Sequence, residues 1–151
     1  NDITAEAMIN RATFYYHFED IYDLLDKSLS EVLLVNLDCE TYKSSELNEE
    51  VVCSIFKAIT DFQMSLSTRC HRGYEDTIAR IIREQLEIIF YQMLLKQRAN
   101  EDMQALKLTA LMLSWGIYGA SVEWKRSGEK VEPETYIKSV IPYIMSGISG
   151  M

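Results

Sequence analysis

The sequence predicts an all-α fold, and three observations support that prediction. Hydrophobic residues make up 48% of the 151 residues, and over most of the chain they recur at intervals of three and four, the spacing of one helix face. No stretch of useful length alternates apolar and polar residues as a half-buried strand does. Only six Gly and two Pro interrupt the chain, which is too few for the many turns of an all-β fold.

The expected helices have ends set by capping residues and helix breakers. They span residues 2–8, 10–16, 20–41, 47–67, 75–97, 101–126 and 133–147. Asn100 is expected to cap the helix over 101–126, followed by two acidic residues in its first turn, and Gly128 to stop it. Pro133 suits the first position of the last helix, and Pro142 inside that helix is expected to kink it.

The net charge of −8 and the pI near 4.8 indicate an acidic protein. Such a balance argues against indiscriminate coating of nucleic acid, but it leaves room for a local surface that reads DNA. The uncharged run over 108–122 is shorter than the roughly 20 residues of a bilayer-spanning helix. Cys39, Cys53 and Cys70 are scattered without a C-x-x-C pair, as in reduced cytoplasmic proteins. We therefore expect a cytoplasmic protein without a membrane partner.

Catalytic and metal chemistry find little support in the sequence. It has no Gly-rich phosphate loop and no local motif that combines His, Asp and Ser. Cys70 and His71 would be half of a metal site, but no second ligand pair is close in sequence. Glu84 and Glu87 share a helix face, and exposure of that face to solvent explains these two residues better than acid–base catalysis does. We therefore expect no enzyme activity, no cofactor and no metal.

The segment from Ala7 to Phe18 contains no acidic side chain. Asn10 is a good cap for the short helix that follows, and Thr13, Tyr16 and His17 fall on a shared face of it. Arginine pairs with guanine edges or phosphates, and Thr and Tyr hydroxyls commonly bind phosphates. A DNA-binding surface is one interpretation of this segment. The other is an amphipathic connector whose tyrosines cover an edge of the core.

The residues from Ile3 to Phe18, followed by Asp23-Leu24-Leu25, resemble the helix-turn-helix of the tetracycline-repressor (TetR/AcrR) family of transcriptional regulators. The run Thr13-Phe14-Tyr15-Tyr16-His17-Phe18 matches the family's T-[LF]-Y-x-H-F pattern. The resemblance implies a DNA-binding head at residues 1–20, whose first helix is absent from this chain, and a helical body at residues 21–151. The DNA-facing residues that it implies are Asn10, Arg11, Ala12, Thr13, Tyr15, Tyr16 and His17.

The sequence departs from the family pattern at two places in this head. Met8 stands where the family has a turn glycine, so the turn must accept a side chain or shift. Glu19, Asp20 and Ile21 stand where many relatives carry a phosphate-binding lysine. The second departure weakens that contact with phosphate.

In the body, Gly116, Gly119 and Ala120 form a stripe without bulky side chains, which indicates close contact with another helix. From the residues alone, that helix can belong to the same chain or to a partner. The resemblance implies a homodimer that pairs the helices over 101–126 and 133–147. The expected interface residues are Gly116, Gly119, Ala120, Glu123, Tyr136 and Val140.

The resemblance also implies a pocket for a small-molecule effector between the helices over 47–67, 75–97 and 101–126. The candidate lining residues are Phe56, Phe62, Phe90, Met93 and Trp115. Ordinary core packing is the competing explanation for each of them, because aromatic and Met stripes at helical spacing usually form cores.

The expected function is that of a TetR-type DNA-binding regulator. Such a protein would be a homodimeric repressor that binds a palindromic operator in double-stranded DNA and responds to a small molecule. The alternative is a helical protein-interaction module, or a co-regulator that does not bind DNA, with a degenerate helix-turn-helix. Glu19, Asp20 and Ile21 favour the alternative.

Overall fold

The computed structural model describes residues 24, 27–33, 37, 46–67 and 75–149. This part of the chain contains helices and the turns that join them, without a strand. The predicted all-α fold is therefore confirmed. The expected helices over 2–8 and 10–16 lie outside the described residues. Of the helix expected over 20–41, residues 24, 27–33 and 37 are described, and all of them are helical.

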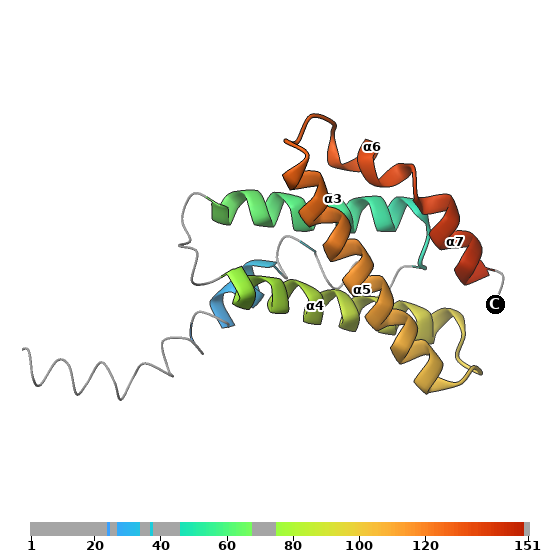
Figure 1. Cartoon of the computed structure of the whole chain (residues 1–151). Helices are drawn as coiled ribbons and strands as arrows, with labels where there is room; N and C mark the ends of the chain where they lie inside the picture. Colours follow the sequence, from blue (N-terminus) through green and yellow to red (C-terminus); the bar gives the residue numbers. More distant parts are fainter. Residues whose placement is uncertain (1–23, 25–26, 34–36, 38–45, 68–74, 150–151) are drawn as a thin grey trace, which may run out of the picture.

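From residue 46 onward, the described residues form five helices, and Figure 1 shows their arrangement. They are α3 (Glu49–Ser67), α4 (Glu75–Gln97), α5 (Met103–Arg126), α6 (Pro133–Lys138) and α7 (Ile141–Ser149). The long helix α5 crosses both α3 and α4 and makes its most extensive contact with α4, while α6 packs against α3.

The hydrophobic core lies where α3 and α4 meet α5. The apolar stripe of α4 is buried from its second turn onward, at Ile81, Ile82, Leu86, Ile89, Phe90, Met93 and Leu94. It meets Ile55, Phe56, Ile59 and Phe62 of α3, together with Leu33 and Leu37 from the N-terminal part of the chain, all of which are fully buried. Because burying one such side chain contributes about 1.5–3 kcal/mol, this cluster holds the body together.

Helix α5 begins later than the sequence predicts. Its cap is Asp102 instead of Asn100, because the carboxylate of Asp102 accepts a hydrogen bond from the backbone N–H of Gln104 at 3.0 Å. The preceding residues form a turn, in which the N–H of Glu101 bonds to the carbonyl of Arg98 at 3.1 Å. An ion pair of 2.8 Å between Arg98 and Glu101 holds this turn, so its acidic residue is not in the first helical turn.

The predicted end of α5 is confirmed. Lys125 and Arg126 occupy its last turn, and Gly128 follows with a φ of 94°. The N–H of Gly128 bonds to the carbonyl of Lys125 at 3.2 Å. Glycine suits this left-handed position because it has no Cβ to clash with the neighbouring carbonyl.

The last expected helix, over 133–147, is in fact two helices. The structure has a turn at residues 139–140 between α6 and α7, instead of a kink at Pro142. Proline lacks an N–H, and its ring clashes with the carbonyl four residues earlier, here that of Lys138. The helix therefore ends before the proline, and Pro142 lies in the first turn of α7, where its N–H is not needed. Pro133 opens α6 as predicted.

Candidate functional site

Helix α5 carries two apolar faces. The first is buried against the core and consists of Leu106, Ala110, Ser114, Ile117, Ser121 and Trp124. The second faces outward and includes four large side chains: Leu108 is 57% exposed, Met112 67%, Trp115 52% and Val122 38%. An apolar composition on two faces explains why α5 is the one helix in the described part of the chain that is long and apolar enough to cross a membrane.

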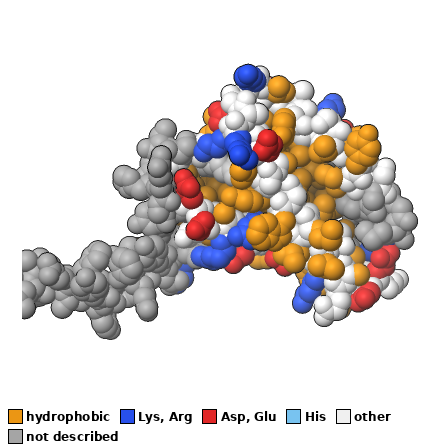
Figure 2. Space-filling view, in the orientation of Figure 1, with side chains coloured by type: hydrophobic (Ala, Val, Ile, Leu, Met, Phe, Trp, Pro, Cys, Tyr) orange, Lys and Arg blue, Asp and Glu red, His pale blue; other side chains and the backbone are white. Residues whose placement is uncertain are grey.

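The outward face of α5 has the spacing of a helix-pairing seam. Its exposed residues alternate by three and four along the helix: Ala105, Leu108, Met112, Trp115, Gly119 and Val122. This alternation is the heptad pattern that lets two helices pack knobs into holes. Figure 2 shows hydrophobic side chains gathered along the front face of the body, where α5 runs in Figure 1. We call these six residues the α5 seam.

An apolar groove of about 450 Å³ lies beside the seam, between α5 and the pair α6–α7. It is lined by Thr109, Met112, Leu113, Gly116, Ile117, Ala120, Ile137, Val140, Tyr143 and Ile144. The side chains of Val140 and Tyr143 are 42% and 80% exposed. Seam and groove together form a continuous exposed apolar surface, which is uncommon on a monomeric protein.

The structure answers where the contact partner of the two glycines can be. Both Gly116 and Gly119 are exposed, and a Cβ added to either one would meet no atom within 4 Å. Within the described residues, no helix of the same chain is close enough to require glycine here. The described residues therefore supply no partner for the close contact that the stripe predicts.

The other residues of the predicted interface are placed differently. Ala120 and Val140 line the groove. Glu123 is exposed and pairs with Arg126 at 3.7 Å. Tyr136 is half-buried and stacks on Phe56, with ring centroids 6.2 Å apart, so it packs inward onto the core.

The predicted effector-pocket residues do not come together as one set. Phe56, Phe62, Phe90 and Met93 have no exposed surface and belong to the hydrophobic core. Trp115 lies on the outward face of α5 instead. A pocket lined by all five stays a prediction.

A group of polar side chains lies among the helices at the junction of α3, α4 and α5. The amide Nε2 of Gln63 donates to the hydroxyl of Ser121 at 3.2 Å, and that hydroxyl donates to the carbonyl of Tyr118 at 2.6 Å. The amide oxygen of Gln63 is buried and has no hydrogen-bond partner. A buried polar atom left in this way costs about 1–3 kcal/mol.

Arg83 of α4 contributes a second unpartnered atom. Its guanidinium lies over the indole of Trp115, with the central carbon 3.7 Å from the ring centroid. Its Nε is buried and has no acceptor. Burial raises the pKa of Tyr118, the charge of Arg83 opposes this effect, and Asp76 and Glu75 add to it.

No sequence motif marks the residues of this polar group, so it could not be predicted. The available signal was polar side chains inside apolar stripes. Ser114 and Ser121 interrupt the buried face of α5, and Gln63 follows Phe62 on α3. Helical periodicity predicts that these three side chains are buried. Only the packing of the helices shows which of their polar atoms lack a hydrogen-bond partner.

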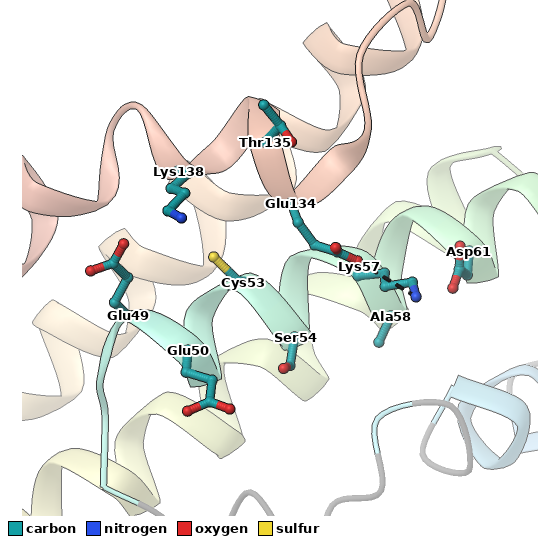
Figure 3. A pocket seen from close by; sticks show the side chains of 10 residues that line it. All are labelled: Glu49, Glu50, Cys53, Ser54, Lys57, Ala58, Asp61, Glu134, Thr135 and Lys138. Atoms are coloured by element: carbon teal, nitrogen blue, oxygen red, sulfur yellow. Dashed lines mark ion pairs between the residues drawn. The ribbon is translucent and has the colours of Figure 1, made fainter.

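A charged groove of about 880 Å³ lies along the surface where α6 packs against α3 (Figure 3). Its walls carry both signs of charge, and Lys57 pairs with Glu134 across it at 3.5 Å. Burial and the nearby Glu49 raise the pKa of the Cys53 thiol, which Lys138 opposes. A raised pKa disfavours the thiolate, which is the reactive form of cysteine. Among the described residues no group of three His, Cys, Asp or Glu is placed to hold a metal ion.

The residues expected to face DNA, from Asn10 to His17, lie outside the described residues. Comparisons with family models, curated proteins and solved structures found no match to this chain. The function must therefore be argued from the sequence motif and from the surface of the body.

Proposed function

We propose that this protein is a TetR-type DNA-binding transcriptional regulator, a homodimeric repressor whose operator binding responds to a small molecule. The observation that carries the proposal is an unpaired α5 seam in the same chain as the Thr13–Phe18 motif. The motif is a candidate DNA-binding element, and the seam is a candidate dimer interface that would bring two such motifs together. The motif alone does not imply a dimer, and the seam alone does not imply DNA binding.

The seam supports a second copy of this chain as the partner. Leu108, Met112 and Trp115 are more than half exposed, and burying each fully would contribute about 1.5–3 kcal/mol. A two-fold axis beside α5 covers the same surface on both protomers at once. Gly116 and Gly119 remove the side chains that would hold the two α5 helices apart.

Dimerisation would give the motif its specificity. One short helix offers few base contacts, whereas two heads related by a two-fold axis read the two halves of a palindrome. The chain has a net charge of −8, so general electrostatic attraction to DNA is weak and each specific contact matters more. Loss of the dimer is therefore expected to abolish operator binding.

The experiment that tests this function selects binding sites from a random duplex pool and measures gel shifts at several salt concentrations. We expect a palindromic preference and an affinity that falls steeply with salt. Thr13→Ala and Tyr16→Ala should each weaken specific binding by about 1–3 kcal/mol. Thr135→Ala, which changes an exposed threonine of α6, is the control and should bind as the wild type does.

The alternative function is a helical protein-interaction module with a degenerate helix-turn-helix. Glu19, Asp20 and Ile21 favour it, because two acidic residues near the motif repel phosphate. It predicts no sequence preference at any salt concentration and no effect of Thr13→Ala or Tyr16→Ala on residual DNA binding. That result would replace the regulator with the interaction module.

A further inference from the structure

The α5 seam carries large and small side chains in a definite order along the helix. Met112, Trp115 and Val122 are 67%, 52% and 38% exposed. Gly119 follows Trp115 in the seam and is exposed too. A Cβ added to Gly119 would meet no atom within 4 Å, so a recess lies next to the largest side chain of the seam. The seam therefore has both the protrusions and the recess that close packing of two helices requires.

This order distinguishes the two directions in which a second copy of α5 can pack on the seam. In a parallel two-fold pair, each residue faces its own copy. Trp115 would then meet the partner's Trp115, and Gly119 would face the partner's Gly119 across an empty space. The partial charges at the ends of two parallel helices also repel, whereas those of antiparallel helices attract. A parallel pair is therefore unfavourable in both shape and charge.

An antiparallel pair can place large side chains opposite small ones. In such a pair, residues at equal distances from the two-fold axis along the two helices face each other. With the axis at the midpoint between Trp115 and Gly119, Trp115 faces the partner's Gly119. Met112 then faces the partner's Val122. Every protrusion at the centre of the seam meets a smaller residue, and the same contacts occur twice in the dimer.

Gly116 falls within one residue of that midpoint, so its own copy lies beside it across the axis. Gly116 is exposed, and a Cβ added there would meet no atom within 4 Å. Two helices that lack side chains at their closest point bring their backbones nearer to each other. Gly116 therefore sets the approach of the two helices, and Gly119 receives the indole.

Arg83 prepares Trp115 for this contact. The central carbon of its guanidinium is 3.7 Å from the centroid of the ring, so one ring face is covered within the protomer while the residue stays half-exposed. A side chain that is already held in place loses less conformational entropy on association. The exposed part of the indole is thus presented to the partner in a defined position.

We propose that two copies of this chain pair their α5 helices antiparallel, with Trp115 of each protomer seated against the partner's Gly119. The inference rests on the proposed function, which includes the homodimer, and adds the direction and the register of the pairing. In this register Trp115 is the residue that determines which surfaces fit together, because the recess at Gly119 is matched to a large side chain.

Analytical ultracentrifugation of the full chain over a dilution series gives the Kd of the dimer. Gly119→Leu fills the recess and should raise this Kd at least about hundredfold. Adding Trp115→Ala makes room for the new leucine, so the double variant should have a Kd at least about tenfold below that of Gly119→Leu. Adding Leu108→Ala instead is the matched control, because Leu108 does not face the partner's Gly119, and it should restore nothing.

Cross-linking under mild oxidation tests the direction of the pair. Facing Cα atoms on two closely packed helices lie within the range that a disulfide spans. Gly116→Cys should therefore form a covalent dimer across the axis. Val122→Cys should not, because it faces the partner's Met112, whereas in a parallel pair it would face its own copy. The wild type, with its three native cysteines, gives the background.

The proposed pairing is overturned by a wild type that stays monomeric, by a covalent dimer of Val122→Cys, or by failure of Trp115→Ala to restore the Gly119→Leu dimer. The gel shifts judge the proposed function separately. Palindromic operator binding by a dimer of another register removes this pairing and keeps the regulator. The expected rescue and cross-link without operator binding keep the pairing and remove the regulator.

Discussion

The two tryptophans of α5 show how one residue type takes opposite roles on one helix. Trp124 is buried, and its indole Nε1 donates to the carbonyl of Val131 at 2.7 Å, which ties the loop after α5 to the helix. Trp115 is half-exposed on the seam and is covered on one face by Arg83. The difference lies in which side of α5 each residue occupies.

Replacing Trp124 tests the tie to the loop. Trp124→Phe leaves the carbonyl of Val131 without its donor and a gap beside the ring, so we expect the free energy of unfolding to fall by about 1–3 kcal/mol. Urea denaturation followed by circular dichroism measures it. Trp115→Phe is the matched control, and a loss of stability as large as that of Trp124→Phe would contradict this assignment.

Tyr118 gives the stability of the protein a dependence on high pH. Burial raises the pKa of this phenol in the folded state above its ordinary value of 10.0. The folded state then holds the proton more tightly than the unfolded state does. The contribution of Tyr118 to stability is therefore complete below pH 10.0 and is lost as the pH rises through the folded-state pKa.

The variant Tyr118→Phe should lose less stability than the wild type as the pH rises above 10.0, as measured by urea denaturation at a series of pH values. The control is Tyr143→Phe, which changes a tyrosine that is 80% exposed. If the wild type and Tyr118→Phe showed parallel pH profiles, burial of this phenol would not be the cause.

At the scale of elements, the ends of α5 show that local chemistry sets helix boundaries. Asp102 caps the start, and Gly128 allows the reversal after the end. Two candidate caps, Asn100 and Asp102, stand close together in the sequence. The turn held by Arg98 and Glu101 comes just before the helix, and the carboxylate of Asp102 accepts from the N–H of Gln104 in its first turn.

Asp102→Ala should lower the free energy of unfolding by about 0.5–2 kcal/mol, because it removes the acceptor for the N–H of Gln104. Asp102→Asn keeps an oxygen at the same place and should remain close to the wild type. Asn100→Ala should have a much smaller effect. A larger loss from Asn100→Ala than from Asp102→Ala in thermal unfolding would return the cap to Asn100.

At the scale of the whole molecule, the α5 seam, the groove and the two exposed glycines belong to one surface. In the single chain, a side chain at Gly119 meets no atom, and replacing an exposed helical glycine normally stabilises the helix. In the proposed dimer, the same side chain enters the space between two α5 helices. The two cases therefore predict opposite effects of one substitution.

Gly119→Leu should yield monomers that keep their helical content, because overpacking separates the protomers. Light scattering gives the oligomeric state, and circular dichroism gives the helicity. The Tm of the wild type should rise with protein concentration, while that of the variant should not. Asp61→Leu, which changes an exposed residue of α3 outside the seam, is the control. An unchanged dimer in Gly119→Leu would remove the seam from the interface.

The sequence by itself determined the helical class and most boundaries of the described helices. The reason is that periodicity, Pro133 and Gly128 act through their near neighbours in the chain. It also predicts close contact at Gly116 and Gly119, which stays a prediction. These features are local, and no distant part of the chain is needed to read them.

The tertiary structure decided everything that depends on which face meets which. Periodicity gives α5 two apolar faces, but only packing against α4 leaves Leu108, Met112 and Trp115 outside. It separates Trp115 from the buried set of Phe56, Phe62, Phe90 and Met93. It also leaves Gln63 and Arg83 with unpartnered atoms, because hydrogen-bond partners come from residues far apart in sequence.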